Sequence, residues 1–216
     1  MVNIVLITGN EGKRKEIESI LGKSASIINI KMDLPEIQTI SVEEVIVEKI
    51  KFALMQAKTP DVFNQIKSKF SDKNIIINSI NDFVLICEDT GLYIKKMNNF
   101  PGALIKFYFE CLDNTGIIKR DHGSKAEVIC VIGVVSKGKI VKPVIGKVKG
   151  KIAKQILGDN GFGWDASFIP NLKNTIYKDS NGKSYAELSN DIKNNISHRF
   201  IAFSNFKKKY IMTTKK

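Results

Sequence analysis

The chain has 216 residues, of which 43% are hydrophobic and 26% are charged. A chain of this size and composition can bury a substantial core, and it contains no strongly biased block typical of disorder. No apolar run reaches the length that spans a bilayer, and residues 1–7 contain no basic leader. We therefore expect a cytoplasmic protein without a membrane partner, folded as a single domain over residues 1–216.

The chain is strongly basic, with a formal net charge of +12. Seven lysines fall between Lys137 and Lys154, and no arginine or aromatic residue lies among them. Three of them, Lys147, Lys149 and Lys151, alternate with apolar or small residues and are predicted to share the outward face of a strand. This pattern favours a solvated surface, so nucleic acid is not an expected partner.

The three cysteines are far apart in the sequence and form no C-x-x-C pair. An odd number of isolated cysteines indicates reduced thiols rather than a disulfide framework or a zinc site.

The first part of the chain alternates predicted strands and helices. The pattern predicts a strand over residues 2–7, a helix over 13–21, a second strand over 27–32 and a helix over 42–57. Residues from about 60 to 82 are polar and predict an irregular insertion with room for a short helix.

The second part is richer in strand patterns. Residues 83–87 predict a short strand that delivers Glu88 and Asp89 at its end, and Pro101-Gly102 is expected to open a helix. Residues 126–135 and 140–148 predict an antiparallel pair around a turn, 166–169 a strand and 197–210 a helix. The sum is a mixed α/β fold with a long central sheet.

Residues 8–13, Thr-Gly-Asn-Glu-Gly-Lys, lie between the first strand and the first helix. Free backbone N–H groups, glycines, a hydroxyl and a lysine at a helix N-terminus are the parts of a phosphate cradle. The spacing is too short for a Walker A loop, and no Ser or Thr follows the lysine. Taken alone, the segment fits a plain capped turn better than a phosphate site.

Three further segments carry candidate chemistry. Glu88 and Asp89 offer hard oxygen ligands for Mg²⁺ and a group to position water, and Glu36 is a third candidate ligand; the alternative is a solvated acidic turn. Residues 161–165 place the only tryptophan, Trp164, beside an acid, as a base-binding wall or as a core residue at a turn. Residues 193–199 gather two cations, a histidine and a hydroxyl where a helix begins, as an anion site or as a simple cap.

The whole set, in this order, resembles the inosine/xanthosine triphosphate pyrophosphatase family. The matching motifs are T-G-N-x-x-K at 8–13, D-L-P-E at 33–36, E-D-T-G-L at 88–92, P-G at 101–102, F-G-W-D at 162–165, Y-A-E-L at 185–188 and S-H-R at 197–199. The resemblance implies an elongated, two-lobed α/β fold with a nucleotide cleft between the lobes, and a homodimer. It also implies hydrolysis of ITP, dITP and XTP to the monophosphate and pyrophosphate, with Mg²⁺, or Mn²⁺ as a substitute.

The resemblance assigns roles to individual residues. It implies that Asp89 activates the attacking water, supported by Glu88 and Lys13, and that Glu36 and Asp89 bind the metal. The implied substrate contacts are Thr8, Gly9, Asn10, Glu11, Gly12, Lys13, Lys49, Asp89, Thr90 and Lys106 on the phosphate side. On the base side they are Phe162, Gly163, Trp164 and Asp165, and Lys193, His198 and Arg199 complete the base and phosphate contacts.

Two other readings compete. A Maf-like pyrophosphatase would share the architecture but prefer pyrimidine or modified nucleotides, and the F-G-W-D and S-H-R motifs argue against it. A basic nucleic-acid-binding module with a degenerate nucleotide fold is opposed by the intact carboxylates and by Lys13. The polar segment of about 60–82 and the lysine-rich residues 137–154 depart from the usual family pattern, and both lie outside the motifs.

Overall fold

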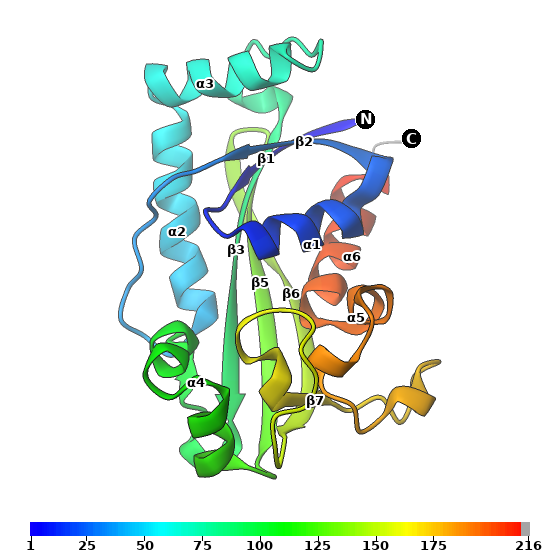
Figure 1. Ribbon diagram of the computed structural model, residues 1–216. Coiled ribbons are helices and arrows are strands. Elements are labelled where there is room, and N and C mark those ends of the chain that lie inside the picture. The colour runs from blue at the N-terminus through cyan, green and yellow to red at the C-terminus, as the bar shows by residue number, and fades with distance from the viewer. Residues whose placement is uncertain (213–216) are drawn as a thin grey trace.

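The computed structural model describes residues 1–212, which form an elongated molecule around one long, twisted sheet (Figure 1). The sheet has the strand order β2-β1-β3-β5-β6-β7, with β4 paired to β3. The strands are β1 (Val2–Ile7), β2 (Ala25–Ile30), β3 (Val84–Ile94), β4 (Pro101–Gly102), β5 (Lys125–Ser136), β6 (Lys139–Ile152) and β7 (Phe168–Pro170). The α/β class with a long central sheet is confirmed.

The helices cover both faces of the sheet (Figure 1). One face packs against α2, and the other packs against α1 and α6, each through its own apolar core. A third core packs α4 against the first residues of β5 and the last residues of β6. The helices are α1 (Glu11–Leu21), α2 (Val42–Ala57), α3 (Pro60–Ser71), α4 (Ile105–Asp121), α5 (Asn190–Ile196) and α6 (His198–Tyr210).

The parallel part of the sheet determines where a ligand can bind. Strands β2, β1 and β3 run parallel, and β1 stops at Ile7, opposite Cys87 of β3. Strand β3 continues for seven residues beyond that point, paired only with β5 and β4 along this stretch. A crevice outside the carboxyl ends of parallel strands is the usual ligand site of such sheets.

The structure corrects three expectations from the sequence. Residues 60–71 form the regular helix α3, whose Ile66 and Phe70 are buried against α2 and the sheet. Glu88 and Asp89 lie within β3 rather than in a turn after it, because β5 continues to pair along this stretch. Pro101-Gly102 pairs with β3 as β4, and the helix begins only at Ile105.

The lysines of β6 lie where the alternation predicts. Lys147, Lys149 and Lys151 are exposed, while Val148 and Ile152 between and beyond them are buried. Within residues 1–212, no helix is both long and apolar enough to cross a membrane.

Candidate active site

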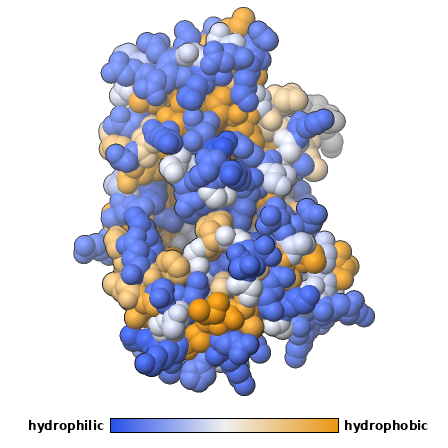
Figure 2. Space-filling model, viewed as in Figure 1, coloured by the Kyte–Doolittle hydropathy of each residue, from blue (hydrophilic) through white to orange (hydrophobic). Residues whose placement is uncertain are grey.

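A cleft with a volume of about 900 Å³ opens at the carboxyl ends of β1 and β2, beside the middle of β3. This volume lies within the range of small-molecule sites. Figure 2 shows that hydrophilic residues dominate this side of the molecule, with smaller hydrophobic areas near its two ends. The cleft walls come from segments at both ends of the chain, from Ile7 to Arg199.

Most of the residues singled out from the sequence line this cleft. They are Thr8, Gly9, Asn10, Lys13, Glu36, Lys49, Glu88, Asp89, Thr90, Lys106, Phe162, Gly163, Trp164, Asp165, Lys193, His198 and Arg199. Two do not: Glu11 is exposed and pairs with Arg14 on its own helix, and Gly12 lies next to the Phe162 ring. A Cβ atom at Gly12 would lie 3.1 Å from the Phe162 ring, so Gly12 allows α1 to approach the 162–165 segment.

The loop after β1 is held in a fixed shape at the N-terminus of α1. Asn10 caps the helix, because its side chain accepts a hydrogen bond of 2.9 Å from the backbone N–H of Lys13. The Thr8 hydroxyl accepts a hydrogen bond of 3.1 Å from the N–H of Asn10, and Asn29 of β2 donates one of 3.2 Å to the Thr8 carbonyl. The loop therefore presents a helix N-terminus to the cleft, which is favourable for phosphate.

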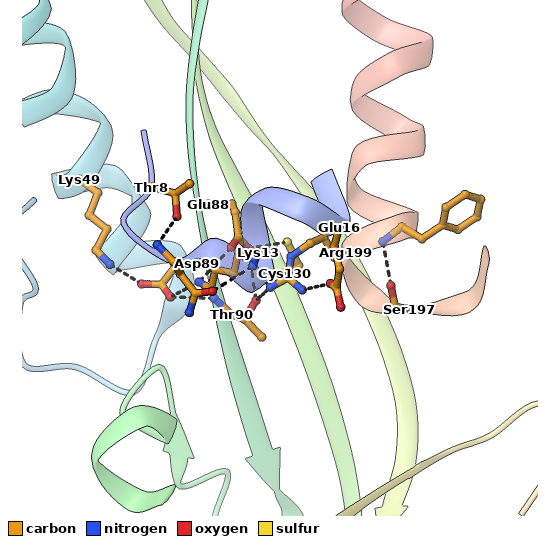
Figure 3. A network of polar contacts seen from close by, with 12 residues as sticks. Thr8, Lys13, Glu16, Lys49, Glu88, Asp89, Thr90, Cys130, Ser197 and Arg199 are labelled. Atoms are coloured by element: carbon orange, nitrogen blue, oxygen red, sulfur yellow. Dashed lines mark hydrogen bonds and ion pairs between the residues drawn. The ribbon is translucent and has the colours of Figure 1, made fainter. Parts of the chain in front are cut away.

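Glu88 and Asp89 point to opposite faces of β3, because consecutive strand residues alternate. Asp89 lies on the side of α2, where its Oδ2 atom is 2.7 Å from Nζ of Lys49. Glu88 lies on the side of α6, 3.4 Å from Arg199. Lys13 approaches the strand edge left open by β1 and pairs with Glu88 at 2.9 Å and with Asp89 at 3.7 Å. Figure 3 shows these residues converging from α1, α2, β3 and α6.

The two carboxylates differ in their environment. The Glu88 side chain is only 1% exposed, and its Oε2 atom accepts hydrogen bonds from Thr90 and from the Cys130 thiol. Burial alone would raise the pKa of Glu88, but Arg199 and Lys13 hold it well below its ordinary value. The Asp89 side chain is 17% exposed and lines the cleft. Glu88 is therefore a fixed anion that orients cations, and Asp89 is the carboxylate open to a ligand.

Glu16 of α1 was missed by the sequence analysis, although it joins two predicted residues. It accepts a hydrogen bond of 2.7 Å from Lys193 and also pairs with Arg199. Lys193 in turn lies 2.7 Å from Asp165. Burial alone would raise the pKa of Glu16, but Arg199 and Lys193 lower it, so Glu16 is ionised at neutral pH.

Together these contacts form a chain of alternating charges across the cleft, which we call the charge row. Its members, in spatial order, are Glu36, Lys49, Asp89, Lys13, Glu88, Arg199, Glu16, Lys193 and Asp165. Lys106 lines the cleft outside the charge row, with Nζ 5.8 Å from the centre of the Phe107 ring.

Aromatic rings gather at the end of the cleft near Asp165. The Trp164 and His198 rings lie 5.9 Å apart, and Nζ of Lys193 is 4.8 Å from the centre of the Phe162 ring. Burial and the nearby cations lower the pKa of His198 well below its ordinary value, so the imidazole is neutral. Both His198 nitrogens and Nε of Arg199 are buried and have no hydrogen-bond partner within the described residues.

The carboxylates of Glu36 and Asp89 fit a magnesium ion. Both are hard oxygen donors, and both contact the ammonium group of Lys49, so the space between them is favourable for a cation. No group of three or more His, Cys, Asp or Glu side chains within residues 1–212 is arranged to hold a metal. A site with two carboxylates suits Mg²⁺, which commonly completes its coordination with water and substrate phosphates.

The fold and the cleft define a class of α/β proteins that bind ligands at the carboxyl ends of parallel strands. A family model places the chain more narrowly: residues 4–209 match the Ham1 family, and the chain belongs to it. The resemblance drawn from the sequence motifs is thereby confirmed.

Individual relatives cover nearly the whole chain. Inosine triphosphate pyrophosphatase 2 of Trypanosoma cruzi is 31% identical over 199 residues, covering 91% of this chain and 86% of that protein. The dITP/XTP pyrophosphatase of Methanopyrus kandleri is 29% identical over 213 residues, covering 97% of this chain and 96% of that protein. A HAM1 protein from Coxiella burnetii shares the fold over 100% of both chains, with a TM-score of 0.67 and 24% identity.

Proposed function

We propose that this chain is a Mg²⁺-dependent pyrophosphatase that converts ITP, dITP and XTP to the monophosphate and pyrophosphate. The observation that carries the proposal is one cleft that combines a phosphate loop, an accessible carboxylate and an aromatic pocket. The names of the relatives, inosine triphosphate pyrophosphatase and dITP/XTP pyrophosphatase, support the same substrates.

In the proposed reaction, the triphosphate lies along the loop before α1. Asn10 and the helix N-terminus would bind its oxygens, with Lys13, Lys49 and Lys106 as cationic contacts. Hydrolysis of a phosphoric anhydride requires charge neutralisation and an in-line water more than a covalent nucleophile. A Mg²⁺ ion held by Glu36 and Asp89 would supply charge neutralisation on the phosphates.

Asp89 is the proposed base that orients the water and accepts its proton. Its exposed fraction of 17% leaves it accessible, whereas Glu88 is enclosed and fully paired. Glu88 would act by fixing Lys13 and Arg199, each of which pairs with it. The two adjacent carboxylates therefore have separate roles.

The base would enter the aromatic end of the cleft. Trp164 and Phe162 offer ring faces for stacking, and Arg199 carries only donors, which suit the 6-oxo oxygen of hypoxanthine or xanthine. An adenine would instead present its amino group to these donors. Leaving a buried donor unpaired costs roughly 1 to 3 kcal/mol, enough to discriminate a 6-oxo purine from adenine.

The test is pyrophosphate release from ITP, XTP, dITP, ATP, GTP and dTTP, with and without Mg²⁺. We expect Mg²⁺-dependent turnover of ITP or XTP, weak turnover of ATP and GTP, and loss of activity in Asp89→Asn. Asp61→Asn makes the same chemical change on the exposed surface of α3 and should keep full activity. Cleavage of no nucleotide, or full activity in Asp89→Asn, would refute the proposal.

We also propose a homodimer, on the basis of the family resemblance. Light scattering on the purified protein should then give twice the chain mass of 24.2 kDa. A mass of one chain at micromolar concentration would rule the dimer out.

A further inference from the structure

Lys49 occupies an unusual position for a lysine. It lies on the apolar face of α2, between Ile46 and Ile50, and only 9% of its side chain is exposed. Its ammonium group lies 2.8 Å from Oε1 of Glu36 and 2.7 Å from Oδ2 of Asp89. The ammonium thus lies between the two carboxylates that fit a magnesium ion.

Each of the two carboxylates depends on Lys49 in a different way. Glu36 is on the loop between β2 and α2, its side chain is 53% exposed, and Lys49 is its ion-pair partner. Asp89 is anchored by the backbone N–H of Thr90, which donates to Oδ1 at 2.8 Å, so Oδ2 is the atom that faces Lys49. Without a cation between them, the two negative charges would repel each other.

A divalent cation cannot take the same carboxylate oxygens while the ammonium remains there, because the two positive charges would repel strongly in this half-enclosed cleft. The second partner that Lys49 needs lies nearby. Lys49 and the phosphate loop, including Thr8 and Lys13, line one cleft, so an ammonium that leaves the carboxylates can contact a bound triphosphate.

We propose that Lys49 is an internal, exchangeable counter-ion: it holds Glu36 and Asp89 together in the metal-free protein and moves to the triphosphate when a divalent cation replaces it. This inference rests on the proposed function, because it takes the metal ligands from it. It makes metal and nucleotide binding mutually dependent. The metal alone must displace Lys49 and leave it unpaired, whereas a metal–nucleotide complex supplies the ammonium with phosphate oxygens.

The deciding experiment measures Mn²⁺ binding to the nucleotide-free protein by electron paramagnetic resonance. Lys49→Met removes the competing ammonium, so it should bind Mn²⁺ at least about tenfold more tightly than the native protein. Lys49→Arg retains the charge and should bind Mn²⁺ like the native protein. Lys106→Met removes a cleft cation that contacts neither carboxylate, and should change the affinity by less than about twofold.

Equal or weaker Mn²⁺ binding by Lys49→Met would overturn the inference, as would an equal gain in Lys106→Met. If Lys49 served only to bind phosphate, its removal would leave the Mn²⁺ affinity of the nucleotide-free protein unchanged. The direction of the change therefore distinguishes a phosphate-binding lysine from an exchangeable counter-ion. Release of pyrophosphate is not part of this readout. The native protein could release no pyrophosphate while Lys49→Met still binds Mn²⁺ more tightly. That result would refute the proposed activity and leave the exchange of Lys49 standing.

A second measurement follows the ammonium group in the native protein itself. In native protein labelled with ¹⁵N at lysine Nζ, the enclosed Lys49 ammonium should give a resolved signal, assigned by its absence in Lys49→Arg. Addition of Mg²⁺ should shift or remove that signal. A signal that stays unchanged at saturating Mg²⁺ would show that the ammonium is not displaced.

Discussion

Nζ of Lys193 on α5 donates a 2.7 Å hydrogen bond to Oε1 of Glu16 on α1, across 177 positions of the chain. The other oxygen of Glu16 pairs with Arg199 on α6. One carboxylate thus ties the helix that follows the phosphate loop to the two helices that carry the base-side cations. The relative position of the two ends of the cleft therefore depends on Glu16.

Glu16→Gln is expected to lower the free energy of unfolding by roughly 3 kcal/mol, because it leaves two buried cations without their shared anion. Only 13% of the Glu16 side chain is exposed. Glu18→Gln is the matched control on the same helix. Glu18 forms a more exposed pair with Arg14, which should contribute less than about 1 kcal/mol. Urea unfolding followed by circular dichroism measures both, and equal losses would contradict the assigned role.

The same residue predicts a pH dependence of stability. The pKa of Glu16 is lowered in the folded protein from its ordinary value of 4.5, since Arg199 and Lys193 outweigh the effect of burial. Its contribution is therefore complete above about pH 4.5 and is lost as the pH falls through the lower, folded pKa. The difference in unfolding free energy between native protein and Glu16→Gln should shrink from pH 6 to pH 3. A constant difference would show that Glu16 is not stabilised as an anion.

Asn114 is predicted to position the segment that carries Trp164. Its Nδ2 donates a 3.0 Å hydrogen bond to the Gly163 carbonyl, and its Oδ1 accepts one of 2.6 Å from Ser167, so one amide holds both ends of Gly163–Ser167. Asn114→Ala should raise KM for ITP severalfold with a smaller effect on kcat.

Trp164 gives an independent readout of the same segment, because it is the only tryptophan in the chain. In Asn114→Ala without nucleotide, its fluorescence should be quenched more readily by acrylamide than in the native protein. Thr115→Ala, at the exposed neighbouring position, should leave both KM and quenching unchanged. Unaltered quenching in Asn114→Ala would show that Asn114 does not position the segment that carries Trp164.

Gly146 on β6 lets α6 pack directly on the sheet. A Cβ atom there would lie 2.1 Å from the carbonyl oxygen of His198 and 2.4 Å from the backbone nitrogen of Ala202. Gly146→Ala should therefore lower the free energy of unfolding by about 1 to 3 kcal/mol and displace the start of α6 from the cleft. Gly9→Ala, where a Cβ meets no atom within 4 Å, should change stability by less than about 0.5 kcal/mol. Thermal unfolding of the two variants makes the comparison.

The sequence indicated most of the residues that line the cleft through the motifs of the family resemblance. It failed where the neighbours decide the structure. Glu88 and Asp89 look like part of a polar turn, yet they lie within a strand because β5 pairs along it and cations from three helices neutralise them.

Two misses left a signal that could have been used. Glu16 follows Lys13 by three positions, a spacing that places both on one face of α1, directed at the cleft. In α3, Phe63, Ile66 and Phe70 recur at helical spacing within an otherwise polar segment. They pack on the core between α2 and the sheet. Asn114 carries no comparable local signal, because its partners lie 49 and 53 positions away.

The charge row has a consequence for the form in which a substrate enters. It contains five acidic and four basic side chains, so its cations are already matched by neighbouring anions despite the net charge of +12 for the whole chain. Within the charge row, a triphosphate would therefore find no unpaired cation. We therefore expect the nucleotide to arrive already complexed with a divalent cation, and the lysines on the outer surface to affect the rate of encounter more than the affinity.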